Sequence, residues 1–397
     1  EPMTTTVNHW IDNKEYVSTS GRTAEVFDPA LGEVTKHVAL ANASEIEAAI
    51  ASAKAAFPAW SNLSLARRQA IMFNFRELLN RKKPELAEII TSEHGKVLSD
   101  ALGEITRGQE VVEFATGMPH LLKGFYSENV STGVDVYSTR QALGVVGIIS
   151  PFNFPMALAI GPSSAAMMAG NTVVLKPSDT TPVSSVRMAE LITDAGILPP
   201  GVVNIVCGRG DSVGAPLIRD PRIRVASLTG DVSTGSKIME AAARGIKRTH
   251  LELGGKAPVI VLADADIPAA VEAIAEGGYY NAGQDCTAAC RVYAHAAIHD
   301  RLIAEFAGRP YRPSQLVLRS QGQTGIGEPI TAERILERRR LCGYCKRMDH
   351  HAGRVQHRSQ QQSWCDAGSR QRLYGRYCRG RVELRHRGRC ESTPGRG

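Results

Sequence analysis

The chain has 397 residues, 43% hydrophobic and 22% charged, which is enough for two domains with well-formed cores. No apolar run reaches the roughly 18 residues that a membrane span requires, and the N-terminus EPMTTTVNHW lacks the pattern of a secretory signal. Glu1 and Pro2, ahead of Met3, are interpreted as an upstream or cloning remnant. These features predict a globular, cytoplasmic protein with no membrane partner.

The net charge of +7 is unevenly distributed along the chain. Residues 309–397 contain 20 basic and 7 acidic residues, whereas residues 1–308 contain 27 basic and 33 acidic residues and carry −6. The part with regular patterning is therefore mildly acidic, which argues against a nucleic-acid partner. Its three cysteines, Cys207, Cys286 and Cys290, are typical of a reducing compartment.

Helical periodicity dominates residues 44–123, and residues 133–140 alternate with the period of a strand. Residues 143–151 form a continuous β-branched run that predicts a buried parallel strand. The same signature recurs further along the chain, with helical stretches between, at residues 172–178, 202–208, 224–230 and 257–266. Alternating strands and helices predict a doubly wound α/β domain.

From residue 309 the chain changes character, with 19 arginines against one lysine and no sustained periodicity. An out-of-frame stretch of a GC-rich gene typically encodes such a sequence, and a disordered interaction tail is the alternative. Cys342 and Cys345 form C-x-x-C close to two histidines, but irregular neighbours and the absence of a second ligand pair favour no metal site.

Two residues carry candidate chemistry. Cys286 in NAGQDCTAAC is a candidate nucleophile, and Glu252 in LELGGK, 34 residues earlier, is a candidate base. A cysteine can attack an aldehyde carbonyl, and a carboxylate can then activate water to hydrolyse the resulting thioester. For Glu252 alone, a helix-end or salt-bridge glutamate is the simpler interpretation, just as a lone cysteine is more often a core residue.

The runs PFNFP, LKPS, G-x(4)-G, LELGGK and GQDC, in this order and spacing, resemble the NAD(P)-dependent aldehyde dehydrogenase superfamily over about residues 7–307. The resemblance implies a Rossmann-type NAD-binding domain at 7–118 and 141–253, an oligomerisation hairpin at 119–140 and the start of a catalytic domain at 254–308. Residues 309–397 depart from this pattern. They lack the family's E-x-F-G-P run, so the catalytic domain is expected to be truncated and an inactive remnant stays an alternative. The family forms dimers or tetramers, and a homo-oligomer is expected if the C-terminus is intact.

The resemblance also implies site residues. Cys286 is the nucleophile, Glu252 the base, and Asn153 an oxyanion donor together with the backbone N–H of Cys286; without the other motifs, Asn153 is a turn asparagine. Pro151 and Phe152 of the same run are expected beside the cofactor.

The expected cofactor is NAD, with NADP possible. By resemblance Lys176 contacts the adenosine ribose, with Ser178 beside it, although a solvated strand-end lysine is the alternative. Asp179 favours a free 2′-hydroxyl by charge repulsion. Gly230 and Gly235 bound the GDVSTG turn expected to receive the pyrophosphate, and Gly254 with its neighbour lets the backbone approach the nicotinamide; these roles complete the list of expected cofactor contacts.

In GDVSTG the family commonly has serine where this chain has Asp231. An aspartate there opposes a diphosphate unless it turns away to cap the helix.

Two subfamily resemblances compete for the substrate. Residues 9–160 resemble methylmalonate-semialdehyde dehydrogenases, which are acylating, and residues 200–295 resemble aminobutyraldehyde and related aminoaldehyde dehydrogenases. The catalytic half favours oxidation of an ω-aminoaldehyde such as 4-aminobutanal, with Asp285, Tyr279 and Tyr280 receiving its ammonium group. A coenzyme A-acylating semialdehyde dehydrogenase is the alternative, although acylating relatives generally lack the counterpart of Glu252.

Overall fold

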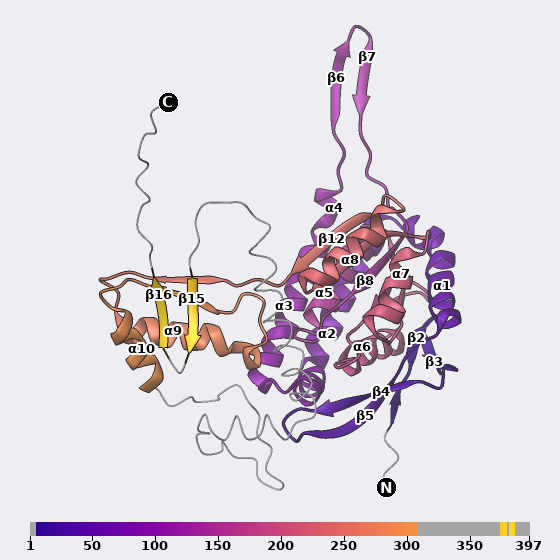
Figure 1. Ribbon diagram of the computed structural model, residues 1–397. Helices are drawn as coiled ribbons and strands as arrows, with labels where there is room; N and C mark the ends of the chain where they lie inside the picture. Colours follow the sequence, from indigo (N-terminus) through magenta and orange to yellow (C-terminus); the bar gives the residue numbers. More distant parts are fainter. Residues whose placement is uncertain (1–4, 309–373, 379–380, 386–397) are drawn as a thin grey trace, which may run out of the picture. The chain divides into compact units, whose positions relative to one another are not determined.

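The computed structural model describes residues 5–308 and the backbone of 374–378 and 381–385 (Figure 1). The chain divides into two units, Glu1–Arg338 and Arg339–Gly397. In the second unit β15 (Tyr374–Cys378) and β16 (Arg381–Arg385) pair antiparallel. The expected out-of-frame origin of the tail and the C-x-x-C pair otherwise lie outside the described residues.

A seven-stranded sheet in the order β12-β11-β8-β9-β10-β2-β3 forms the centre of the first unit. Five strands are parallel, and two N-terminal strands extend the sheet in antiparallel fashion. The parallel strands are β8 (Val145–Ile149), β9 (Thr172–Lys176), β10 (Val203–Ile205), β11 (Ile223–Gly230) and β12 (Arg248–Leu253); the antiparallel ones are β2 (His9–Ile11) and β3 (Lys14–Tyr16). Every residue of β8, β9 and β10 is buried, as the continuous β-branched runs predict for strands covered on both faces.

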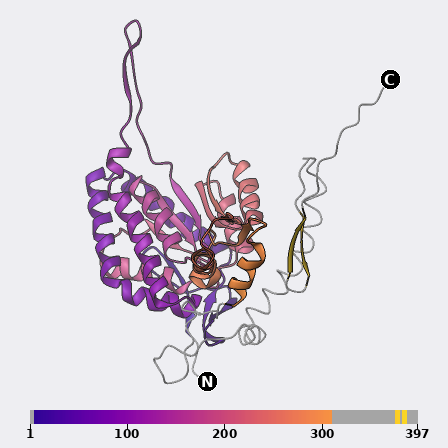
Figure 2. The ribbon, with the colours of Figure 1, turned by 90° about the vertical axis from the view of Figure 1, so that its left-hand side faces the viewer.

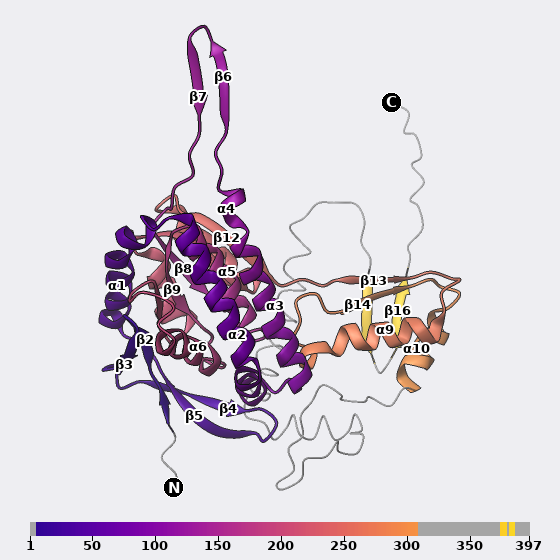
Figure 3. The same ribbon diagram turned by 180° about the vertical axis from the view of Figure 1, so that it is seen from behind.

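Helices cover both faces of this sheet (Figures 1 and 3). Successive strand side chains point to opposite faces, so Val173 and Leu175 join one core while Val174 joins the other. The first core contains α2 (Leu65–His94), α3 (Leu98–Thr116), α5 (Ala157–Met168) and α6 (Val183–Asp194); the second contains α1 (Ala43–Ser61), α7 (Ala215–Arg219) and α8 (Val232–Ala243). The predicted doubly wound α/β arrangement is confirmed.

The strand β12 carries Glu252 but was not predicted as a strand. It pairs in parallel with β11 at the edge of the sheet, and none of its residues is fully buried. An edge strand with one partner does not need a continuous apolar run, so RTHLEL lacks the signal of the central strands. The helix-end interpretation of Glu252 is therefore wrong.

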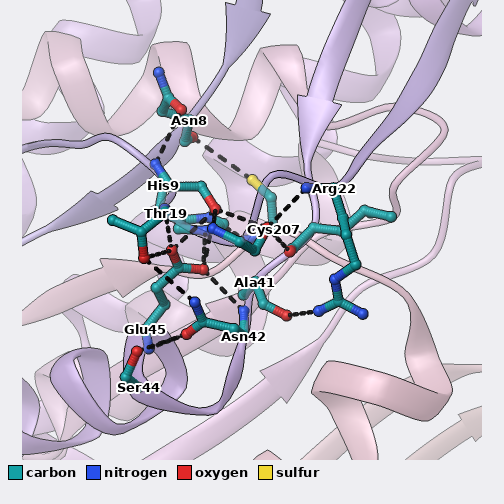
Figure 4. A network of polar contacts seen from close by, with 12 residues as sticks. Asn8, His9, Thr19, Arg22, Ala41, Asn42, Ser44, Glu45 and Cys207 are labelled. Atoms are coloured by element: carbon teal, nitrogen blue, oxygen red, sulfur yellow. Dashed lines mark hydrogen bonds and ion pairs between the residues drawn. The ribbon is translucent and has the colours of Figure 1, made fainter.

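The N-terminal segment is held against the sheet by a buried carboxylate (Figure 4). Glu45, in the first turn of α1, accepts hydrogen bonds from the backbone N–H groups of Thr19 and Asn42 and from the Ser18 hydroxyl. Asn42 in return caps α1 by accepting from the Glu45 N–H, which completes a capping box. His9 lies between Glu45, 3.2 Å away, and the N–H of Cys207, two residues after β10, so one buried network joins β2, α1 and the segment after β10.

A hairpin of β6 (Tyr126–Ser131) and β7 (Val134–Tyr137) follows the short helix α4 (Met118–Leu121). Every residue of both strands is exposed, and the ribbon extends away from the helices in all views (Figures 1, 2 and 3). A second small sheet contains β1 (Thr6–Val7), β5 (Glu33–Ala39) and β4 (Thr23–Asp28). No helix in the described part of the chain is long and apolar enough to cross a membrane.

Residues 254–308 form a small layer with its own apolar cluster. Here β13 (Pro258–Val261) and β14 (Arg291–Ala294) pair in parallel, and two helices and a short 3₁₀ turn accompany them: α9 (Ile267–Tyr279), η2 (Tyr280–Gly283) and α10 (His299–Gly308). Val261 and Val271 are buried together in this cluster. The candidate nucleophile lies between η2 and β14.

Candidate active site

The order of the parallel strands indicates where in this sheet a ligand site is expected. From β8 the chain proceeds outward through β9 and β10, then returns to the other side of β8 with β11. Such a reversal opens a crevice at the carboxyl ends of the two strands on either side, which is where open α/β sheets bind ligands. Here these ends lead into Pro151 to Asn153 after β8, and from Gly230, the last residue of β11, into Asp231.

Cys286 follows a turn with unusual backbone geometry. Asn281, Ala282 and Gly283 have φ angles of 56°, 57° and 75°, in the left-handed region that non-glycine residues rarely adopt. The fully buried Asn281 holds this turn by donating from Nδ2 to the carbonyl oxygens of Gln284 and Asn153, both at 2.9 Å. A strained turn that is held by hydrogen bonds is typical of a functional site.

The structure brings Cys286 and Glu252 into one neighbourhood. Burial raises the pKa of the Cys286 thiol, and the negative charges of Asp285 and Glu252 raise it further. Glu252 is exposed near the end of β12, and the ideal Cβ position of Gly255, three residues on, lies 3.8 Å from the carbonyl oxygen of Cys286. The raised pKa keeps Cys286 protonated at neutral pH, so a nucleophilic role requires a base beside it.

Asn153 lies against the same turn. Its Nδ2 donates to the carbonyl oxygen of Gln284 at 2.9 Å, two residues before Cys286. An amide nitrogen has two hydrogens, so one remains for a developing oxyanion. The oxyanion role of Asn153 stays a prediction.

Lys176 ends β9 and is buried, with 3% of its surface exposed. Its ammonium donates to the carbonyl oxygens of Pro177 at 2.7 Å and Gly208 at 2.8 Å, and burial lowers its pKa. The solvated strand-end interpretation is therefore wrong. Ser178 and Asp179 follow it at the carboxyl end of the strand and are half-buried, where both are accessible to a ligand.

The GDVSTG turn joins β11 to α8. Gly230 ends the strand and accepts a hydrogen bond from the N–H of Gly254. A Cβ on Gly235 would lie 2.8 Å from Leu253, so the glycine allows α8 to pack closely on β12. Gly254 has open space where a Cβ would point, which fits the close approach of a flat ring.

Asp231 caps α8, as anticipated for an aspartate at this position. Its carboxylate accepts from the N–H of Thr234 at 3.0 Å and from the Thr234 hydroxyl at 2.7 Å. Hydrogen bonds from Ser233 and Thr234 outweigh burial and lower the pKa of Asp231 to about 2. The roles of Gly230, Gly235 and Gly254 in holding a dinucleotide stay predictions, and the charge of Asp231 would oppose a phosphate at this helix end.

Pro151 and Phe152 connect β8 to this site. The Phe152 ring stacks on His94 with 6.0 Å between the ring centroids, and its carbonyl oxygen accepts a weak bond of 3.4 Å from Thr181. Both residues are half-buried, and their contact with a cofactor stays a prediction.

Three residues at this site were not singled out from the sequence: Asn281, Lys96 and Glu104. Lys96 donates to the carbonyl oxygen of Asn153 at 2.8 Å and pairs with Glu104. Nothing in the sequence separates this lysine and glutamate, eight positions apart, from surface charges. For Asn281, the succession of an asparagine, a small residue and a glycine before Gln284 was an available signal for a left-handed turn.

A doubly wound parallel sheet, with the turn before Cys286 hydrogen-bonded to the segment after β8, is typical of a dinucleotide-binding oxidoreductase. Comparison with known proteins agrees with this class. The sequence model described as "Aldehyde dehydrogenase family" matches residues 16–343, and the chain belongs to that family. The family resemblance and the aldehyde dehydrogenase fold predicted from the motifs are confirmed.

Among curated relatives, malonate-semialdehyde dehydrogenase of Pseudomonas aeruginosa is 38% identical over 298 residues, covering 75% of this chain and 60% of the relative. The acylating methylmalonate-semialdehyde dehydrogenase of Arabidopsis thaliana mitochondria is 44% identical over 271 residues, covering 68% of this chain and 44% of the relative. Among solved structures, a putative methylmalonate-semialdehyde dehydrogenase from Sinorhizobium meliloti 1021, complexed with NAD, has a TM-score of 0.75 and 36% identity. It covers 84% of this chain and 67% of the other.

These relatives support the resemblance found in residues 9–160 and do not show the aminoaldehyde resemblance of residues 200–295. The chain spans 60% of the Pseudomonas relative's length.

Proposed function

We propose that the protein oxidises a short-chain semialdehyde of the malonate type, with NAD as the hydride acceptor. The observation that supports the proposal is that the negative charge of Glu252 acts on the Cys286 thiol, while Asn153, after β8, donates a hydrogen bond to the turn before Cys286. The relatives favour malonate and methylmalonate semialdehyde over an ω-aminoaldehyde. NAD, when bound, accepts the hydride of the aldehyde carbon.

The residues have distinct roles in this proposal. Cys286 attacks the aldehyde carbonyl, and because its pKa is raised, Glu252 first removes the thiol proton. The free N–H of Asn153 and the backbone N–H of Cys286 stabilise the oxyanion of the thiohemiacetal. Glu252 is exposed and passes the thiol proton to solvent. As a carboxylate again, it removes a proton from the water that hydrolyses the thioester, which releases a free acid.

For the cofactor, Ser178 and Asp179 are proposed to contact the adenosine ribose and Gly230 to contact the pyrophosphate. The ammonium of Lys176, held by two carbonyl oxygens, stands at the same strand end and donates its remaining hydrogen to the ribose. Gly254 leaves room for the nicotinamide beside Glu252. Asp179 repels a 2′-phosphate and so favours NAD over NADP.

A second candidate is transfer of the acyl group to coenzyme A, which the name of the Arabidopsis relative supports. The two candidate reactions differ in the group that attacks the thioester, which is water in one and the thiol of coenzyme A in the other. Glu252 favours hydrolysis, since a positioned carboxylate activates water.

The test measures NADH formation by the full chain with malonate semialdehyde, methylmalonate semialdehyde and 4-aminobutanal, each with and without coenzyme A. We expect NADH from the semialdehydes without coenzyme A. At alkaline pH, where the Cys286 thiol loses its proton without Glu252, Glu252→Gln should stall with an acyl group on Cys286, visible as a mass increase. Near neutral pH this variant should form neither NADH nor the acyl group. Glu240→Gln, on the exposed face of α8, should turn over normally at both pH values.

Strict dependence on coenzyme A would establish the second candidate. Faster oxidation of 4-aminobutanal would restore the aminoaldehyde assignment, for which the negative charges of Asp285 and Glu252 near Cys286 provide a physical basis. No NADH from any of the three aldehydes would support an inactive protein.

A further inference from the structure

A buried ion pair, Lys96 with Glu104, contacts the main chain of the candidate oxyanion donor Asn153. Lys96 follows α2, Glu104 lies in α3, and neither side chain is exposed. Nζ of Lys96 is 2.5 Å from Oε2 of Glu104. Burying an ammonium and a carboxylate costs desolvation energy that the pair's attraction often does not recover, so such a pair is weak evidence for a purely stabilising role.

The pair holds both ends of the segment that contains Asn153. At one end, the Lys96 ammonium donates to the carbonyl oxygen of Asn153 at 2.8 Å and lies 4.5 Å from the centroid of the Phe154 ring. At the other end, Oε1 of Glu104 accepts from the N–H groups of Met156 at 2.8 Å and Ala157 at 3.2 Å, at the start of α5. The segment is therefore fixed by charge-assisted bonds along its length.

The cysteine turn meets this segment at the same atom. Asn281 donates to the Asn153 carbonyl oxygen at 2.9 Å, and the Asn281 N–H donates to Asp100 of α3 at 3.2 Å. Asn153 donates in the opposite direction, to Gln284. One carbonyl oxygen, with Lys96 on one side and Asn281 on the other, thus joins the segment after β8 to the turn before Cys286.

Lys96 also balances negative charge around the nucleophile. Glu104, Asp100 and Asp285 all act on Lys96, and Asp285 is one of the two carboxylates that raise the pKa of Cys286, the other being Glu252 of β12. Arg107 of α3 acts on Tyr280, at the start of the cysteine turn. Of the two cations named here, Lys96 and Arg107, Lys96 is fully buried.

We propose that Lys96 is a positioning residue, whose ammonium fixes the main chain of Asn153 against the cysteine turn and offsets the charge of Asp285 beside Cys286. The proposal rests on the proposed function in one respect, namely that Cys286 is the reacting group. It predicts that removing the positive charge and removing its partner's negative charge act on Cys286 in opposite directions. If the ion pair were merely structural, its loss would change the reactivity of Cys286 in the same direction in both variants.

The experiment follows alkylation of Cys286 by iodoacetamide in the full chain as a function of pH, with the modified peptide quantified by mass spectrometry. Lys96→Met should raise the pH midpoint and slow alkylation near neutral pH about three- to tenfold, as expected for a charge removed in a medium of intermediate dielectric. Glu104→Gln should lower the midpoint and speed alkylation, while its amide oxygen still accepts from Met156. Lys82→Met, which breaks a half-exposed pair with Glu85, is the matched control and should change nothing.

Shifts in the same direction, or no shift in Glu104→Gln, would overturn the proposal. If Lys96→Met does not fold, which circular dichroism reports, Glu104→Gln alone still decides, because faster alkylation is expected only if a buried cation acts on Cys286. Alkylation needs neither substrate nor cofactor, so the proposed function and the role of Lys96 can fail separately. If the chain oxidises aldehydes, Lys96→Met should lower kcat with little change in the KM of the aldehyde, because the fully buried Lys96 side chain bonds to Glu104 and Asn153.

Discussion

At the scale of single residues, the capping aspartate of α8 has the clearest consequence for the cofactor. Its carboxylate accepts from donors of the first helical turn, and the low pKa of about 2 keeps Asp231 charged at neutral pH. A phosphate group bound at the same helix end would lose those donors and face a like charge.

We therefore expect Asp231→Ser to bind NAD about fivefold more tightly, the effect of roughly 1 kcal/mol at a helix N-terminus. Serine is an equally good cap, so stability should change little. Titration calorimetry measures the affinity, and Asp266→Ser, which alters the equivalent cap of α9, is the control. Equal affinities for Asp231→Ser and the parent would mean that the pyrophosphate lies elsewhere.

Glu93 and His94 at the end of α2 have opposite dependences on pH. Burial raises the pKa of Glu93 from 4.5 to about 7, although Val183 and Ser184 donate backbone bonds to it. Burial, with the charge of Lys96, lowers the pKa of His94 from 6.5 to about 3. The stabilisation from protonated Glu93 is lost as pH rises from 4.5 through 7, and that from neutral His94 is lost as pH falls from 6.5 toward 3.

Between about pH 7 and about pH 5 these two contributions oppose each other, each by up to about 2 kcal/mol. Relative to the parent, His94→Gln should gain free energy of unfolding on acidification, and Glu93→Gln should lose it. Urea unfolding at both pH values measures the difference, with exposed His120→Gln as control. Parallel responses of the two variants would contradict the assignment.

At the scale of elements, the hairpin of β6 and β7 and the residue before it leave large apolar side chains exposed in the described part of the chain. Phe125, Tyr126, Val136 and Tyr137 are 72%, 64%, 51% and 75% exposed. A two-stranded ribbon of this kind is only marginally stable by itself, and an exposed apolar edge is a pairing surface. We propose, in agreement with the resemblance, that a second copy of the chain covers it.

Val136→Lys should then lower the molar mass of the particle in solution without changing its circular dichroism, because a charged residue in the interface must be desolvated. Multi-angle light scattering after size exclusion provides the mass. Val17→Lys, at a position 65% exposed away from the hairpin, should leave it unchanged. A parent chain that is already monomeric would sink this proposal.

At the scale of the whole molecule, charge is separated along the chain, with −6 on residues 1–308 and +13 on residues 309–397. Opposite charges on different copies attract over about 30 Å at an ionic strength of 0.01 M but only about 3 Å at 1 M. Light scattering of the full chain should therefore report a fall in apparent mass as salt is added. Val136→Lys should show the same salt response, since the hairpin is not its cause; a mass that does not depend on salt would refute this prediction.

The sequence by itself determined the doubly wound class, because the central strands are covered on both faces and must be continuously apolar. It also determined the chemical candidates, since Cys286, Glu252 and Asn153 lie in motifs whose order and spacing resemble one family. It did not reveal β12, because an edge strand with one partner carries a weaker apolar signal.

Only the tertiary structure decided which charges act on the site. From the sequence, Lys96 and Glu104 are indistinguishable from charged residues on a solvated helix surface. They are buried because α3 packs under the segment after β8. In the same way, the hydrogen bonds among Asn153, Asn281 and Gln284 join residues up to 131 positions apart. Local periodicity determines which face of an element is buried, but contacts over such separations arise only when the elements pack together.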